Sequence, residues 1–209
     1  MKKEFRVHQH GLETVFVGEY GSMYSSCFSR NSFYEQGFLD YVRSQRIEGV
    51  YLDVGANIGN HSVYFSQHCP SSIVYAFEPL DRYSKYILRN IKANDLDNVI
   101  LCPFALGCNS SHQIVKVKAG EFEVESRNLD ELTAEIPGRI ALIKIDVEGM
   151  ETEVLIGGMT RIQMDQPRIF VEANSVEDLE RLERILSSIG YQRTNKIWNA
   201  SPTYEFIME

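Results

Sequence analysis

Two carboxylates flanking a glycine-rich turn are the residues of this sequence best suited to bind a nucleoside. Residues 51–60 predict a strand followed by a tight turn, and residues 74–79 predict a second strand that ends in an acid. That acid, Glu78, lies 19 residues beyond Gly59, where α/β folds place the carboxylate that accepts hydrogen bonds from a ribose diol. Asp53 ends the first strand, against the turn. The spacing therefore predicts a nucleoside site with Glu78 on the ribose.

The glycine spacing argues against a dinucleotide as the ligand. A G-x-G-x-x-G fingerprint needs a middle glycine so that backbone amides can approach a pyrophosphate, and Asn57 stands at that position here. Asp53 would also repel a diphosphate. Its own role is either to organise the turn or to bind the ammonium of the ligand through water. S-adenosylmethionine fits better, because it carries a sulfonium, an adenosine and no phosphate. We predict that the turn and its strands contact this donor through Asp53, Gly55, Ala56, Asn57, Gly59 and Glu78; for Asn57, a purely structural left-handed position is an equal alternative.

A second segment, residues 142–158, gives the sequence a resemblance to the FkbM family of methyltransferases. That family pairs a D-V-G-A-N-x-G turn with a downstream K-I-D-V-E-G-x-E-x-x-V-L-x-G, and this chain carries both in that order. The similarity runs from about Tyr51 to about Asn174. The resemblance implies an S-adenosylmethionine-dependent methyltransferase that acts on a hydroxyl of a sugar, glycan or secondary metabolite. It also implies that Phe104 and Ala105 cradle the adenine, with core packing as the alternative for Phe104.

Acids at the ends of two later strands are candidates for the chemistry. An unactivated hydroxyl needs a base or a cation that favours its deprotonated form. Asp146 and Glu172 end the predicted strands 140–145 and 168–172, so either is a candidate base, and Glu148 is a candidate substrate ligand. Lys144 shares a strand face with Asp146 and is included among the catalytic candidates, with a structural ion pair as its alternative role.

A metal site is the alternative to a metal-free base. Asp146, Glu172 and Asn174 could supply oxygen ligands to Mg²⁺, in a way that resembles metal-dependent O-methyltransferases. His61 follows the turn and is interpreted as a packing or capping residue rather than a base.

The order of elements predicts an α/β fold of the Rossmann-like class I methyltransferase type, with a mainly parallel sheet and a C-terminal antiparallel hairpin. Residues 49–209 form the predicted core, and residues 1–48 a preceding segment that caps it, over the acceptor site. The segment includes a predicted strand at 14–18, a helix at 31–43 capped by Asn31 or Ser32, and several aromatic residues that could roof the acceptor. In the core we predict strands at 49–54, 73–77, 99–103, 140–145 and 168–172, helices at 60–67, 81–93, 128–135, after 149 and at 176–188, an extra hairpin around 113–117, and a closing hairpin of 191–197 with 203–208.

Composition limits the partners of the chain. A formal net charge of −8 over 209 residues argues against a nucleic-acid backbone as the main partner. No apolar run approaches the roughly 20 residues of a membrane span, and no signal peptide is apparent, so we expect a cytoplasmic protein with a small-molecule or glycan acceptor. The four cysteines form no C-x-x-C pair and are interpreted as free thiols. The oligomeric state stays open, as does a partner protein that completes the acceptor site. A non-catalytic nucleoside-binding regulator and a dinucleotide or nucleotide-sugar enzyme are the alternative functions.

Overall fold

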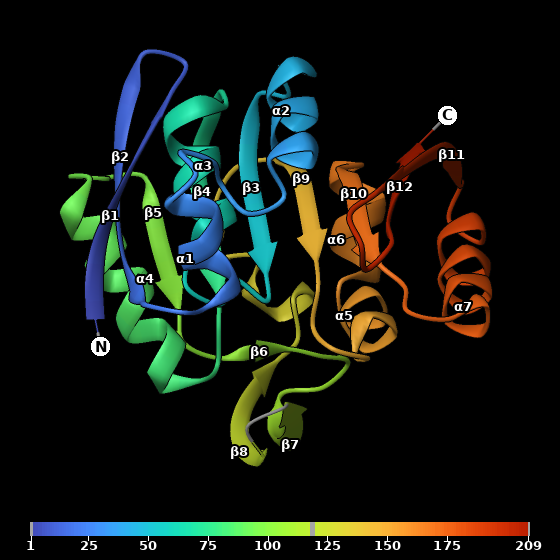
Figure 1. Cartoon of the computed structure of the whole chain (residues 1–209). Coiled ribbons are helices and arrows are strands. Elements are labelled where there is room, and N and C mark those ends of the chain that lie inside the picture. Colours follow the sequence, from blue (N-terminus) through green and yellow to red (C-terminus); the bar gives the residue numbers. More distant parts are fainter. Residues whose placement is uncertain (1, 118–119, 209) are drawn as a thin grey trace.

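A seven-stranded sheet in the order β11-β12-β10-β9-β3-β4-β5 runs through the middle of the molecule (Figure 1). The computed structural model describes residues 2–117 and 120–208. Five adjacent strands, from β10 to the edge strand β5, are parallel, whereas β12 is antiparallel to both of its neighbours, β10 and β11. The strands are β3 (Gly49–Val54), β4 (Ser71–Phe77), β5 (Val99–Cys102), β9 (Ile140–Ile145), β10 (Arg168–Glu172), β11 (Tyr191–Trp198) and β12 (Thr203–Met208). The predicted Rossmann-like fold with a C-terminal hairpin is confirmed.

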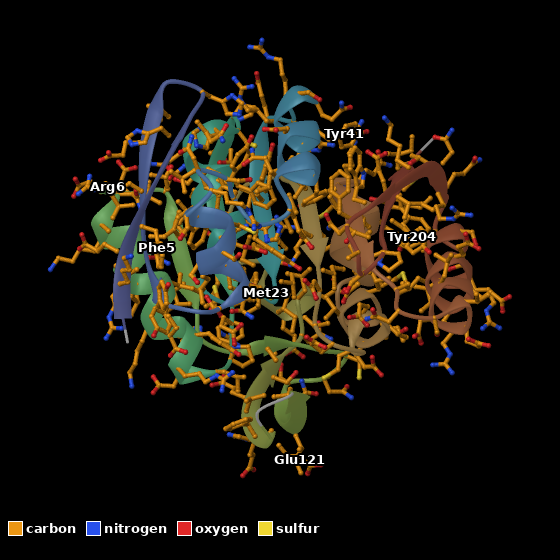
Figure 2. The ribbon with its side chains drawn as sticks, viewed as in Figure 1. Phe5, Arg6, Met23, Tyr41, Glu121 and Tyr204 are labelled. Carbon is orange, nitrogen blue, oxygen red and sulfur yellow. The ribbon has the colours of Figure 1, made fainter. Side chains whose placement is uncertain are left out.

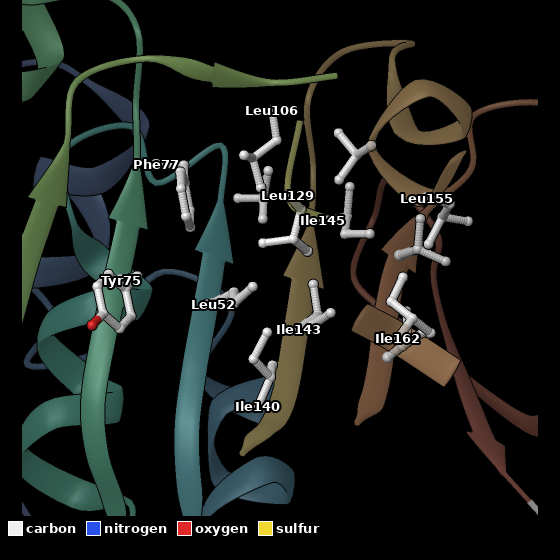
Figure 3. Packing of buried hydrophobic residues seen from close by; sticks show 14 of the residues in the cluster. Leu52, Tyr75, Phe77, Leu106, Leu129, Ile140, Ile143, Ile145, Leu155 and Ile162 are labelled. Carbon is white, nitrogen blue, oxygen red and sulfur yellow. The ribbon is translucent and has the colours of Figure 1, made fainter. Parts of the chain in front are cut away.

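Helices cover both faces of this sheet because successive strand side chains enter opposite layers. Tyr51 packs in one layer and its neighbour Leu52 in the other, and both are fully buried. The layer that contains Leu52 is drawn in Figure 3, where Ile143 of β9 and Leu155 of a covering helix face the same core. On this face lie α5 (Glu151–Gly157), α6 (Met159–Asp165) and α7 (Val176–Ser187); on the other lie α2 (Gln36–Ser44), α3 (Asn60–His68) and α4 (Asp81–Ala93).

The N-terminal segment is a hairpin followed by a short helix. Strands β1 (Lys2–Gln9) and β2 (Leu12–Glu19) pair antiparallel, and α1 (Met23–Phe28) follows. Two asparagine side chains of α4 hydrogen-bond the backbone of β2 along its free edge. Asn90 Oδ1 accepts from the Val17 N–H at 2.7 Å, and Asn94 both donates to the Val15 carbonyl and accepts from the Val15 N–H at 2.7 Å. The strand predicted at 14–18 is present, whereas β1 and α1 were not predicted.

The predicted helix at 31–43 is wrong in its first five residues. Asn31 has a φ of 58°, and its side chain bonds the backbone N–H and carbonyl of His8, at 2.6 and 3.2 Å, so it holds β1 instead of capping a helix. Helix α2 begins at Gln36, after Glu35 in a left-handed conformation.

A small second sheet lies beyond the carboxyl ends of the central strands. It consists of β6 (Ala105–Leu106), β8 (Gly120–Arg127) and β7 (Ser111–Val117), in that order, and contains the hairpin predicted around 113–117. The helix predicted at 128–135 is only a 3₁₀ turn, Asp130–Leu132. The Asp130 carboxylate accepts hydrogen bonds from the backbone N–H groups of Thr160 and Arg161, so it caps the start of α6. None of the helices in the described ranges is long and apolar enough to cross a membrane.

Candidate functional site

A cavity of about 760 Å³ opens where the parallel strands end. The arrowheads of β3, β5 and β9 point to the same edge of the sheet, toward β6 (Figure 1). Walls of the cavity come from the turn after β3, the ends of β4, β9 and β10, the start of α4, the second sheet and the N-terminal segment. Met23 on α1, labelled near the middle of the molecule in Figure 2, belongs to the last of these walls. The cavity thus lies where open α/β sheets bind ligands.

The turn after β3 is held by the neighbouring strands and requires glycine at its start. The N–H groups of Gly55 and Ala56 both donate to the Phe77 carbonyl at 3.0 Å. Gly55 has a φ of 83°, and a Cβ added there would lie 1.8 Å from the carbonyl oxygen of Asp146. Gly55, Ala56 and Asn57 line the cavity, and Gly59, with a φ of 86°, precedes α3. The close approach of β3 and β9 is therefore one physical reason for the glycine that begins the signature turn.

Glu78 lies on the cavity wall with half of its hydrogen-bonding capacity in use. Its Oε2 accepts from the Asn57 N–H and its Oε1 from the Leu80 N–H, each at 2.9 Å. A carboxylate has about four lone-pair sites, so about two remain for a ligand. Burial raises the pKa of Glu78 to about 7, although the two N–H groups act in the opposite direction. Asn57, at a φ of 53°, thus has a structural role in orienting Glu78 through its backbone.

Asp53 lies beneath the floor of the cavity and is not one of the residues that line it. It is fully buried, its Oδ2 accepts from the Ser62 hydroxyl at 2.5 Å, and its Oδ1 lies 3.8 Å from Lys144 Nζ. Lys144 is itself buried, and its Nζ also lies 3.2 Å from Asp146 Oδ2. Burial opposes the charge of Lys144, but the two carboxylates outweigh it and raise the pKa of the lysine. Lys144 is therefore a cation held between Asp53 and Asp146.

Asp146 and Glu172 meet at the ends of β9 and β10 and share a hydrogen bond. Burial opposes the charge of Asp146, but Lys144 and the bond to Glu172 lower the pKa of Asp146. Burial and the neighbouring Asp146 charge raise the pKa of Glu172 to about 7. At neutral pH Asp146 is thus ionised, and Glu172 is poised between its acid and its base form.

The expected magnesium ligands do not fit a metal cage. Lys144 already places an ammonium 3.2 Å from Asp146, where it would repel Mg²⁺, and Asn174 directs its Nδ2 donor to Glu172 Oε2 at 3.2 Å. Within residues 2–117 and 120–208, no group of three or more His, Cys, Asp or Glu side chains could hold a metal ion.

The N-terminal segment forms one wall of the cavity. The sequence had suggested this only because the segment is rich in aromatic residues. Tyr24 and Tyr34 line the cavity with their ring centroids 5.1 Å apart, and burial raises the pKa of each phenol, that of Tyr34 to about 12. Glu35 has a φ of 59°, its Oε2 lies within hydrogen-bonding distance of His61 Nε2, at 3.0 Å, and both side chains line the cavity. Sequence reasoning missed Glu35 because it fell within a predicted helix. The other aromatic residues of this segment do not line the cavity: Phe28 and Phe33 are buried in the core, and Tyr20 is exposed.

The remaining predicted site residues are Phe104, Ala105 and Glu148, and Glu151 supports the last of them. Ala105 lines the cavity, whereas Phe104 lies outside its lining and packs on Phe77 at 5.7 Å, under the guanidinium of Arg127. Glu148 is exposed on the cavity wall with a φ of 57°. Glu151, the acid of the downstream signature, accepts from the N–H groups of residues 147 and 149 at 3.1 Å and so fixes the loop that carries Glu148.

Comparison with known proteins connects this geometry to a family. The model of the methyltransferase FkbM domain matches residues 53–193. A hexuronic acid methyltransferase, AglP, from Haloferax volcanii is 28% identical over 155 residues, which are 67% of this chain and 62% of that protein. Methyltransferase 1 from Beauveria bassiana is 26% identical over 141 residues, 51% of this chain and 57% of that protein. The chain thus spans about six tenths of the length of these curated relatives. Among solved structures, the methyltransferase FkbM from Methylobacillus flagellatus has a TM-score of 0.60 at 20% identity, over 77% of this chain and 43% of its own, which is a likeness of fold.

Proposed function

Since this chain belongs to the FkbM family of methyltransferases, we propose that it transfers a methyl group from S-adenosylmethionine to a hydroxyl of a sugar, glycan or secondary-metabolite acceptor. The family implies S-adenosylmethionine as the donor. The observation that carries the proposal is Glu78, a buried carboxylate on the cavity wall that is fixed by two backbone N–H groups and retains acceptor capacity for a ribose diol.

The cavity suits this donor better than a dinucleotide. Six carboxylates line it against two fixed cations, Arg82 and Lys144, and the ammonium of Lys144 is already shared by Asp146 and Asp53. A pyrophosphate would meet net negative charge, whereas a sulfonium would be attracted. Glu78 would hold the ribose, Ala105 would border the adenine, and the turn of Gly55–Gly59 would face the amino acid portion. When bound, the donor supplies an electrophilic methyl group for in-line displacement.

Glu172 is the base in this proposal. It lies on the cavity wall and is only 7% exposed, and its pKa of about 7 matches the task of taking a proton near neutral pH. Asp146 stays ionised beside Lys144, so it receives the hydrogen bond of a protonated Glu172 and holds that side chain in place. The acceptor hydroxyl would lie against this pair and lose its proton to Glu172 as the methyl group is transferred.

This mechanism uses no metal. We expect methyl transfer to survive exhaustive chelation, because the ammonium of Lys144 occupies the place beside Asp146 that a divalent cation would need. Complete loss of transfer after treatment with EDTA, restored by Mg²⁺, would return Asp146, Glu172 and Asn174 to the role of metal ligands.

The acceptor class is supported by the relative from Haloferax volcanii, which is described as a hexuronic acid methyltransferase. From this relative we carry over to the present chain only the idea that a sugar hydroxyl is methylated. Residues 1–48 would cover the acceptor, since Tyr24, Tyr34 and Glu35 form the wall that faces Asp146 and Glu172.

Calorimetric titration with S-adenosylhomocysteine tests the proposal, with NAD as the control ligand and with the Glu78→Ala variant beside the natural protein. Saturable binding of S-adenosylhomocysteine alone, weakened in the variant, is the expected result. Absence of binding would refute the methyltransferase proposal. Binding without turnover across a library of hydroxyl compounds would favour a nucleoside-binding regulator.

A further inference from the structure

One end of the cavity has more carboxylates than cations. We call this the acceptor end and define it by Tyr24, Tyr34, Glu35, Asp146, Glu148 and Glu172. Lys144 is the fixed cation here, and it is shared between Asp146 and the buried Asp53. The other lining cation, Arg82, lies at the start of α4, stacked on its neighbour Tyr83 with 4.2 Å between guanidinium and ring centroid, on the side of Glu78. The negative charge at the acceptor end therefore exceeds what the protein itself compensates.

Aromatic faces border the same carboxylates. The rings of Tyr24 and Tyr34 are 5.1 Å apart with an interplanar angle of 68°, so the cavity meets two differently oriented rings. The Tyr34 hydroxyl hydrogen-bonds the Glu35 carboxylate, and Tyr34 is close enough to Asp146 and Glu172 to be influenced by their charges. Aromatic faces attract cations through the ring quadrupole, and adjacent carboxylates add to that attraction. Two independent features of this end thus favour an ammonium group.

The donor accounts for only part of this charge. S-adenosylmethionine has a single net positive charge near neutral pH, and its homocysteine product has none. Even if Glu78 and Glu172, whose pKa values are raised to about 7, are counted as neutral, four lining carboxylates remain against Arg82 and Lys144, and one sulfonium does not balance that excess. The remaining negative charge lies at the acceptor end, because Glu78 would hold the donor at the other end of the cavity.

We propose that the acceptor carries a protonated amine near the hydroxyl that is methylated, and no anionic group at that end. This inference rests on the proposed function, since it assigns the side of the cavity away from Glu78 to the acceptor. The ammonium would lie between the Tyr24–Tyr34 wall and the carboxylate of Glu148, with the hydroxyl directed to Glu172. A hexuronate, with its carboxylate, would be repelled, so this chain would differ in acceptor from its relative AglP.

Three probes of equal size test the charge of the acceptor. Each has a cyclohexane ring and one hydroxyl, and they differ at the opposite carbon: trans-4-aminocyclohexanol, trans-cyclohexane-1,4-diol and trans-4-hydroxycyclohexanecarboxylate. Binding is measured at neutral pH and low salt on protein already saturated with S-adenosylhomocysteine. We expect the amine to bind about tenfold more tightly than the diol, and the carboxylate more weakly than the diol. Equal affinities, a preference for the carboxylate or binding of no probe would overturn the proposal.

Saturation with S-adenosylhomocysteine separates the two proposals. Failure at that first step would refute the proposed function itself, whereas donor binding with the wrong order of probes would refute only the amine-bearing acceptor.

A matched pair of variants tests the location. Glu148→Gln removes one exposed carboxylate of the acceptor end, and Glu180→Gln removes one exposed carboxylate on α7, outside the cavity lining. Both change the net charge equally and leave the buried core untouched. We expect Glu148→Gln to reduce the preference for amine over diol about threefold or more, and Glu180→Gln to leave it unchanged. An equal effect of both variants, or of neither, would overturn the assignment of the ammonium to this end.

Discussion

Replacement of Lys144 by Met should strongly destabilise the protein, because the lysine is the cation beside the fully buried Asp53 and the partly exposed Asp146. The Lys144 side chain is 4% exposed, and Asp53, 3.8 Å from it, is fully buried. Asp146 is 3.2 Å away and 34% exposed, so solvent screens its share of the interaction. The variant would leave Asp53 with only the Ser62 hydroxyl as a partner.

The magnitude follows from these distances. At an effective dielectric constant of about 20, unit charges 3.8 Å apart attract by about 4 kcal/mol and those 3.2 Å apart by about 5 kcal/mol. Desolvation offsets much of this attraction, and loss of one partner from a buried pair costs about 3–5 kcal/mol net. We expect the free energy of unfolding to fall by that amount. Lys85 gives the matched control, because it pairs with Asp81 on the surface, with both side chains more than half exposed; Lys85→Met should cost less than about 1 kcal/mol.

The measurement is urea unfolding followed by the fluorescence of Trp198, the single tryptophan, which stacks on Tyr41 at 4.6 Å. The pH dependence has a defined sign. Lys144 lowers the pKa of Asp146 and has its own pKa raised, so its stabilising effect is present between about pH 5 and pH 10 and is lost outside that window. The difference between natural protein and variant should therefore shrink as the pH falls below about 4.

A second substitution tests the cause of the loss. Lys144→Met combined with Asp53→Asn should recover most of the lost stability, since no uncompensated charge is then buried. If Lys144→Met costs no more than Lys85→Met, or if Asp53→Asn restores nothing, the reasoning from buried charge fails.

Three further predictions concern the donor, the base and the turn. Glu78→Gln should weaken S-adenosylhomocysteine binding about 10- to 100-fold, because charge-assisted hydrogen bonds contribute about 1.5–3 kcal/mol; in the natural protein affinity should rise as the pH passes through about 7, where Glu78 ionises, and a flat calorimetric profile would contradict this. Glu172→Gln should lower kcat about 10²- to 10⁴-fold, and the natural kcat/KM should rise with pH through about 7 as the base deprotonates; a variant with normal turnover of an identified acceptor would remove Glu172 from this role. Gly55→Ala should prevent stable folding because its Cβ would meet the Asp146 carbonyl at 1.8 Å, whereas Gly11→Ala, at a similar φ with open space around it, should cost only about 1–2 kcal/mol; similar melting temperatures would contradict the steric argument.

The core could be predicted from sequence because its signals are local. Strands β3, β9 and β10 were predicted with the bounds that the structure has, since each is mainly apolar and ends at or next to a glycine or an acid. Helix α4 was likewise predicted from end to end, as it begins two residues after Pro79 and its apolar positions repeat with the helical period. The acids at the carboxyl ends of the strands then followed from the geometry of a parallel sheet.

The parts that could not be predicted depend on contacts distant in sequence. Asn31 suggested a helix cap, yet its side chain bonds His8 in a strand that the sequence did not reveal. Residues 128–135 suggested a helix, yet Asp130 within them caps α6 about 30 residues away. Asp53 was expected beside the donor, but its side chain pairs with Lys144 of the adjacent strand and lies beneath the floor of the cavity. In each case a polar side chain that the local sequence assigned to one role instead bonds or pairs with a residue from another element.

The first turn of α3 shows how the donor turn and the acceptor wall are joined. Its three first residues point in directions about 100° apart, as a helix requires, and each holds a different part of the site. Asn60 bonds the backbone N–H and carbonyl of Tyr34, His61 bonds Glu35, and Ser62 bonds Asp53. Asn60, His61 and Ser62 are all nearly or fully buried. The partners of Asn60 and His61 both lie within residues 1–48, so each of these hydrogen bonds ties that segment to α3 and contributes about 0.5–1.5 kcal/mol net. The acceptor wall and the Asp53 side chain beneath the donor turn are therefore held by three consecutive residues of one helical turn.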